Sequence, residues 1–151
     1  MSILLITIDP GSAVAQMLKM HYDTTVISPA LAKQCTSWTV YQYIVTYRCP
    51  WIVPKSLLAE WEQAGIQAMN IHPSLLPKYA GLNPWQEMFS CEERTGGVTI
   101  HRLSEVVDAG EIIMQQSMPI LSNDSIGAAR NRADKLAAKM IQTVISKYAI
   151  E

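Results

Sequence analysis

A short polar pattern in the middle of the chain has the residue types of a site that handles a carbonyl group. Asn70, His72 and Ser74 alternate, so in an extended strand their side chains lie on one side. An Asn amide can donate an N–H to an oxyanion, and a His can protonate a leaving group. Pro73 ends regular strand pairing, which puts the pattern at the carboxyl end of a strand. Open parallel sheets place their ligand crevices at that edge, although an Asn and a His there also fit ordinary turn residues.

The loop 104–110 carries a second polar candidate. Asp108 is followed by Ala and Gly, a combination that allows a sharp turn. An isolated Asp in such a loop is usually a turn residue that bonds to its own backbone. By itself Asp108 therefore adds little to a functional prediction.

The elements around these residues alternate between strand-like and helix-like runs. Helices are expected after residue 12 and after Pro54. Strands are expected at 3–8, 24–27, 43–46 and 66–71. The alternation predicts an α/β fold with a mostly parallel, Rossmann-like sheet flanked by helices.

The second half of the chain predicts a helix, a late β-hairpin and a C-terminal helix. The helix starts at Asn83-Pro84, with Asn as its cap, and Gly96-Gly97 is expected to end it. The runs 98–103 and 111–120 form the two hairpin strands. Period 2 places four apolar residues of the second strand on one side, namely Ile112, Met114, Met118 and Ile120. The last helix starts near Asp124 and has a buried face at 3-or-4 spacing.

Length and composition indicate a single domain over residues 1–151. Hydrophobic residues make up 49% and charged residues 17%, which excludes a disordered chain. The formal charge of −1 argues against nucleic acid as a partner, and no apolar run approaches the ~20 residues of a membrane span. Three cysteines without a CxxC fit a reducing cytoplasm, the expected location. The three histidines lack ligand spacing, so no metal is expected.

Three separated segments together resemble the formyltransferase family. They are Asn-x-His-x-Ser-Leu-Leu-Pro-Lys-Tyr-x-Gly from Asn70, the run Thr95–His101, and Asp108–Ile113 followed by Gln115. The close match covers about residues 53–120. Family members transfer a formyl group from 10-formyltetrahydrofolate to an amine, so the resemblance implies this donor as the cofactor and a formyltransferase-like fold.

The resemblance implies a catalytic trio of Asn70, His72 and Asp108, with Ser74 and His101 beside it. Attack of an amine on the formyl carbon produces a tetrahedral intermediate with an oxyanion, which Asn70 can stabilise by roughly 3–4 kcal/mol. His72, made cationic by a nearby carboxylate, can stabilise the oxyanion or protonate the leaving nitrogen. Asp108 can accept the amine proton directly or through water.

The resemblance also suggests where the two substrates bind. The folate is expected against Trp51, Ile52 and Val53, with Val106 and Val107 as a further wall; Trp51 fits core filler equally well. For the acceptor, the candidates are Ser74, Asn83 and His101. To these we add Gly11 and Ser12, where a helix N-terminus could bind a phosphate.

A small primary amine is the expected acceptor. The run from Gly81 to Gln86 is most similar to members that act on nucleotide-linked amino sugars, and glycinamide ribonucleotide comes next. A tRNA acceptor is not expected, because the family members that use it carry a further C-terminal domain and a basic surface.

The chain departs from the family pattern before Asn70, where one βα unit is shortened or absent. A second copy could cover the shortened sheet edge, and the composition permits such a homodimer without requiring it.

Two functions other than formyl transfer to an amine are also compatible with this sequence. In a formyltetrahydrofolate hydrolase, water would replace the amine. A catalytically weak folate- or nucleotide-binding protein, or partner subunit, would have lost turnover.

Overall fold

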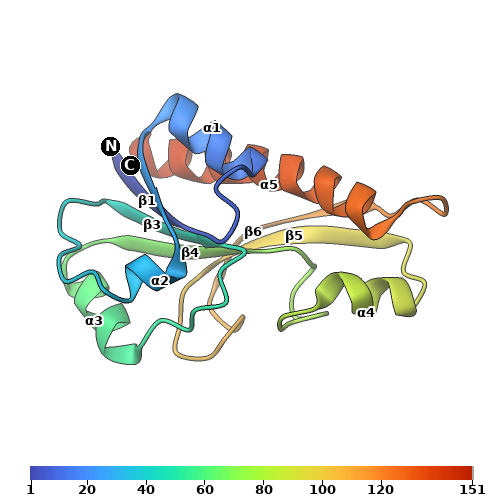
Figure 1. The fold of residues 1–151 in the computed structure, drawn as a ribbon, viewed down its shortest axis with the longest axis horizontal. Helices are drawn as coiled ribbons and strands as arrows, with labels where there is room; N and C mark the ends of the chain where they lie inside the picture. Colours follow the sequence, from blue (N-terminus) through green and yellow to red (C-terminus); the bar gives the residue numbers. More distant parts are fainter. Residues whose placement is uncertain (151) are drawn as a thin grey trace.

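A six-stranded mixed sheet forms the centre of the computed structural model, which describes residues 1–150 (Figure 1). The strand order is β2-β1-β3-β4-β5-β6; the first three neighbouring pairs are parallel, and β4–β5 and β5–β6 are antiparallel. The strands are β1 (Ser2–Ile6), β2 (Asp23–Ile27), β3 (Tyr43–Tyr47), β4 (Gln67–His72), β5 (Thr95–Arg102) and β6 (Ile112–Pro119). The predicted α/β class and the late antiparallel hairpin are confirmed.

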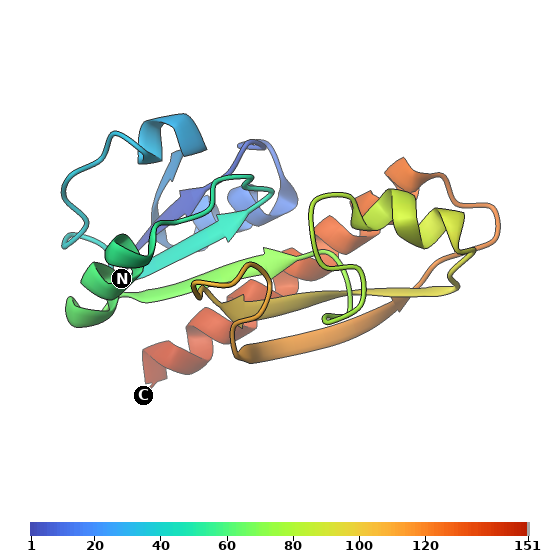
Figure 2. The same cartoon turned by 90° about the horizontal axis from the view of Figure 1, so that it is seen from below.

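Helices cover both faces of the sheet. They are α1 (Ala13–His21), α2 (Pro29–Ala32), α3 (Lys55–Gln63), α4 (Pro84–Ser90) and α5 (Ile126–Ile150). In Figure 1 α1 and α5 lie on one face and α2 and α3 on the other, and in Figure 2 α5 runs along the far side of the sheet. No helix among the described residues is long and apolar enough to cross a membrane.

The alternation of side chains along each strand divides the core into two layers. Met69 and Ile71 of β4 pack on the α1 and α5 side, where α5 contributes small residues such as Ala129 and Ala133. On the opposite side, Trp61 of α3 packs edge-on against Trp38, with ring centroids 5.1 Å apart. Because β4 alternates, the side chains of Asn70 and His72 lie on the α3 side.

The prediction that Gly96-Gly97 ends the α4 helix is wrong. The helix ends at Ser90, and Glu92 takes the left-handed conformation with φ of 53°. Both glycines lie inside β5. At Gly97 a Cβ would come within 2.3 Å of the Leu75 side chain and 2.6 Å of the Gln116 carbonyl oxygen. The close approach of two segments, and not a helix end, requires glycine there.

The predicted apolar face of β6 holds only for its second half. Met118 and Ile120 are buried, whereas Ile112 is 46% exposed. The register shifts at this point, because Ile100 pairs with Met114 while His101 pairs with Ile112. This bulge changes the side on which Ile112 lies, and simple alternation could not anticipate it.

The strands β2 and β6 form the edges of the sheet. Three of the five residues of β2 are partly buried and two are exposed. Coverage of an edge by a second copy therefore stays a prediction.

Candidate active site

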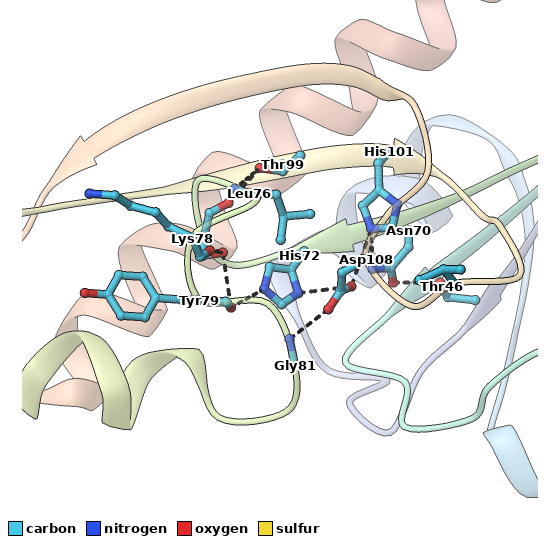
Figure 3. Close-up of polar contacts among 12 residues, drawn as sticks. Thr46, Asn70, His72, Leu76, Lys78, Tyr79, Gly81, Thr99, His101 and Asp108 are labelled. Carbon is cyan, nitrogen blue, oxygen red and sulfur yellow. Dashed lines mark hydrogen bonds and ion pairs between the residues drawn. The ribbon is translucent and has the colours of Figure 1, made fainter.

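Three side chains in one cross-strand row form the base of the site (Figure 3). Thr46 of β3 pairs in register with Asn70 of β4, which pairs with His101 of β5. The Thr46 hydroxyl donates to Asn70 Oδ1 at 2.7 Å, and Asn70 Nδ2 lies 3.1 Å from His101 Nε2. Cross-strand pairing thus aligns the three side chains on the α3 side of the sheet.

His72 is buried and has an acceptor near each ring nitrogen. Nε2 lies 2.8 Å from the carbonyl oxygen of Tyr79, which can only accept, so Nε2 carries a proton. Nδ1 lies 3.5 Å from Asp108 Oδ1. Both ring nitrogens of His72 therefore face oxygen acceptors.

Asp108 reaches the site from the loop between β5 and β6. It has φ of 57°, a left-handed conformation that Asp tolerates better than most residues. Its Oδ2 accepts the N–H of Gly81 at 2.9 Å, and its Oδ1 lies 3.7 Å from His101 Nε2. Burial raises the pKa of Asp108, but the Gly81 N–H that it accepts and the nearby His72 outweigh burial, and the pKa lies below its ordinary value. Asp108 is therefore ionised at neutral pH.

A second cross-strand row holds the loop that follows β4. His72 pairs with Thr99, which pairs with Gln115. The Thr99 hydroxyl donates to the Ser74 carbonyl oxygen at 2.7 Å, and Gln115 Nε2 donates to the Leu76 carbonyl oxygen at 2.9 Å. The Ser74 hydroxyl donates to the Lys78 carbonyl oxygen at 2.6 Å. This row fixes the loop that carries the Tyr79 carbonyl, the acceptor for His72.

One cavity of about 340 Å³ brings the predicted trio together. Asn70, His72 and Asp108 all line it, as do Asn83 and Val107 from the predicted substrate and folate positions. Among the described residues the Asn83 side chain makes no hydrogen bond that caps α4, contrary to prediction. Its amide groups are thereby available to a ligand.

Two cations and a cysteine also line this cavity. Arg48 pairs with Asp9 and lies over the Tyr47 ring, and Arg130 comes from the first turns of α5. Burial raises the pKa of the Cys49 thiol, which keeps it protonated at neutral pH and unsuited to act as a nucleophile.

Ser74 and His101 lie behind the cavity wall. Both are buried, and neither is among the residues that line the cavity. Ser74 acts through the loop after β4, and His101 contacts the trio through Asn70 and Asp108.

The predicted phosphate site at Gly11 and Ser12 is occupied by groups of the protein itself. The N–H of Ala13 donates to Asp134 Oδ2 of α5 at 2.8 Å, and the N–H of Ala15 donates to Ser12 Oγ at 3.1 Å. A carboxylate of α5 thus stands at the N-terminus of α1, where an anionic ligand would otherwise gain from the helix dipole.

The predicted folate residues lie in two groups. Trp51 and Val53 pack against the core beside α3, whereas Ile52, Val106 and Val107 are exposed by 66%, 67% and 54%. Such exposure of apolar side chains on two loops is typical of a binding surface.

A second hollow of about 560 Å³ lies between α3 and the loop that carries Asp108. Its lining includes Leu58, Leu103 and Trp61. Trp61 Nε1 is buried and has no hydrogen-bond partner within residues 1–150. Lys55 and Glu105 form an ion pair of 3.3 Å between the two segments.

Sequence reasoning missed Thr46, Thr99 and the backbone groups of Tyr79 and Gly81. Thr46 is a polar residue inside the apolar run Tyr43–Tyr47, and this contrast is the signal that could have singled it out. Its partner follows from strand register, which the sequence does not reveal.

The sequence model of the family described as Formyl transferase matches residues 8–145. The phosphoribosylglycinamide formyltransferase of Haemophilus influenzae is 42% identical over 80 residues, which are 53% of this chain and 38% of that protein. Methionyl-tRNA formyltransferases are also among the curated relatives. The chain spans about a third of the length of the curated relatives it matches.

The solved structures that share the fold include two formyltransferases. The phosphoribosylglycinamide formyltransferase of Streptococcus pneumoniae gives a TM-score of 0.81 at 20% identity and covers 97% of this chain and 98% of that one. The formyltransferase PseJ of Anoxybacillus kamchatkensis gives 0.75 at 24% identity and covers 93% and 72%. PseJ was solved with UDP-4,6-dideoxy-4-formamido-L-AltNAc and tetrahydrofolate.

Proposed function

Because the chain belongs to the formyl transferase family, we propose that it transfers a formyl group from 10-formyltetrahydrofolate to a primary amine of a small molecule. The observation that carries this proposal is the meeting of an amide, an imidazole and a carboxylate at one cavity, with His72 Nδ1 3.5 Å from Asp108 Oδ1. These are the groups that acyl transfer to an amine needs: an oxyanion donor, an acid and a base.

Each residue of the trio has one task in this reaction. Asn70 donates an N–H to the formyl oxygen as negative charge develops there. Asp108 takes a proton from the amine as its nitrogen bonds to the formyl carbon. His72 gives a proton to the leaving nitrogen of the donor as the old carbon–nitrogen bond breaks. Because His72 Nδ1 lies 3.5 Å from Asp108 Oδ1, the proton that Asp108 has taken up can then pass to His72. This transfer restores both groups for the next turnover.

The formyl donor binds on the α3 side of the trio in this proposal. The exposed apolar side chains of Ile52, Val106 and Val107 suit the flat face of a pterin ring. Trp51 and Val53 support that surface from the core. The neighbouring 560 Å³ hollow, whose lining includes Leu58 and Leu103, supplies further apolar wall.

The acceptor binds in the 340 Å³ cavity, and a nucleotide-linked amino sugar is the favoured class. Asn83 and Gln86 provide amide groups suited to sugar hydroxyls, and Arg48 and Arg130 suit a diphosphate. The bonds from Ala13 to Asp134 and from Ala15 to Ser12 disfavour phosphate at α1, so glycinamide ribonucleotide ranks second.

Release of tetrahydrofolate from 10-formyltetrahydrofolate tests the proposal. The reaction is run with nucleotide-linked amino sugars, with glycinamide ribonucleotide, and without an amine; Asp108→Asn is the inactive control. We expect release that depends on an amino sugar and a formylated product of the corresponding mass. Equal release without amine would replace the transferase with a hydrolase, and no release together with no folate binding would overturn both.

A further inference from the structure

Hydrogen bonds link Thr46, Asn70 and His101 across three strands, and they end at the backbone carbonyl of Arg102. His101 Nδ1 lies 3.0 Å from the carbonyl oxygen of Arg102. A carbonyl oxygen can only accept, so Nδ1 carries the proton. If the ring is neutral, Nε2 is then a bare acceptor.

The tautomer of His101 determines how the neighbouring amide is turned. A bare Nε2 requires the N–H of Asn70 Nδ2, which lies 3.1 Å away. Asn70 Oδ1 consequently faces Thr46, whose hydroxyl donates to it at 2.7 Å. Thr46 and His101 are both 2% exposed, so water does not easily replace either partner.

A competing arrangement places a proton on His101 Nε2 toward Asp108 Oδ1. That separation is 3.7 Å, beyond an ordinary hydrogen bond, whereas the contact with Asn70 is 3.1 Å. The same proton would meet the Asn70 amide nitrogen unless the amide turned over. Turning the amide would place its oxygen beside His101 Nε2 and its nitrogen beside the Thr46 hydroxyl, which would lose the acceptor it now has.

We propose that Thr46 is a positioning residue which, with the Nδ1–H tautomer of His101, holds the Asn70 amide with its nitrogen toward the cavity. Nδ2 carries two hydrogens, so one bonds to His101 and the other remains for the formyl oxygen. The orientation follows from contacts alone. Its catalytic consequence rests on the proposed function.

The tautomer can be measured without any turnover. Long-range ¹H–¹⁵N correlation spectra of the ¹⁵N-histidine-labelled protein distinguish protonated from bare ring nitrogens, and His21→Asn and His101→Asn assign the signals. We expect His101 at neutral pH to show a protonated Nδ1 and a bare Nε2. A protonated Nε2 would overturn the proposed orientation of the Asn70 amide.

The positioning role is measured with a matched pair of variants. Thr46→Val keeps the shape and removes the hydroxyl, whereas Thr46→Ser keeps the donor. With 10-formyltetrahydrofolate and the amine that supports turnover, we expect Thr46→Val to lower kcat about 10-fold to 100-fold, within the range for a misplaced reacting group, and to leave KM nearly unchanged. Thr46→Ser should recover kcat to within about threefold, because only a donor is needed.

The two measurements separate failure of the positioning role of Thr46 and His101 from failure of the proposed function. An unchanged kcat in Thr46→Val, or no recovery in Thr46→Ser, overturns the positioning role. If the unaltered protein transfers no formyl group to any amine, the proposed function fails, and the spectra still decide whether His101 and Asn70 are oriented as described.

Discussion

Two regions at the carboxyl ends of the parallel strands use polar groups in opposite ways. The α1 turn (residues 9–15) follows β1, and the trio site (Asn70, His72 and Asp108) lies where the parallel strand β4 ends. In the α1 turn the amide groups of Ala13 and Ala15 already bond to oxygen atoms of the protein. In the trio site the side chains are held from behind and line a cavity.

The difference teaches that position at a strand end does not by itself make a binding site. Tyr47 and Ala13 both donate to Asp134, so that carboxylate stabilises the contact between α1, α5 and the sheet. Burial raises the pKa of Tyr47; although Arg48 lowers it, Asp134 raises it further, which keeps the phenol protonated as a donor. The trio site instead has supporting groups, such as Thr46 and the Tyr79 carbonyl, that orient side chains toward a hollow.

Removing the carboxylate of the trio tests the comparison most strongly. Asp108→Asn keeps an acceptor for the Gly81 N–H and removes the carboxylate that we propose as the base. We expect kcat to fall about 10²-fold to 10⁴-fold, the range for loss of a general base, with the fold intact by circular dichroism. Tetrahydrofolate release gives the rate. Unchanged turnover would remove Asp108 from the mechanism.

Two glycines, Gly110 beside the trio site and Gly11 in the α1 turn, differ in how closely other atoms approach the backbone. A Cβ at Gly110 would lie 1.7 Å from the Arg102 carbonyl oxygen, whereas a Cβ at Gly11 would meet only the Asp9 side chain, at 3.9 Å. Gly110→Ala must displace the loop of Asp108, and we expect kcat to fall about 100-fold, as for a misplaced catalytic group. Gly11→Ala should stay within about twofold. Equal activity of the two variants would contradict the tight packing of this loop.

The opposite response is expected for Asp134, the α5 carboxylate that accepts a hydrogen bond from the α1 turn. Asp134→Ala leaves two donors without an acceptor, and each should lower the free energy of unfolding by about 1–3 kcal/mol. Urea unfolding measures the loss, and Tyr47→Phe, which removes one donor, is the control. The kcat of the folded variant should change less than about threefold. A large fall in kcat without a loss of stability would place Asp134 in the acceptor site.

The smallest expected effect is on the pH dependence of the free energy of unfolding. The lowered pKa of Asp108 means that its ionised form stabilises the fold above the ordinary carboxyl pKa of about 3.9, and this contribution is lost as the pH falls through the folded-state value. We therefore expect Asp108→Asn to be less stable than the unaltered protein at pH 6 and the difference to shrink below about pH 4. Unfolding at several pH values measures it. A difference that grows on acidification has the wrong sign.

Much of the fold follows from local patterns. The alternation in β4 predicted that Asn70 and His72 share a face, and the periodicity of the last helix predicted its buried side. The errors at Gly97 and Ile112 share a cause: both depend on a neighbouring strand, through a close approach in one case and a bulge in the other. Local patterns carry no information about such contacts.

The residue types and spacing by themselves indicated the α/β sheet class and the resemblance that the family match bears out. The catalytic trio of Asn70, His72 and Asp108 is what that resemblance implies, and it stays a prediction. Only the tertiary structure decided which polar groups face a cavity and which bond to the protein. Thr46 meets Asn70 through strand register, and Asp134 reaches Ala13 from 121 residues along the chain. The physical reason is that a side chain's chemistry is local, whereas its hydrogen-bond partner depends on which distant segment the fold brings beside it.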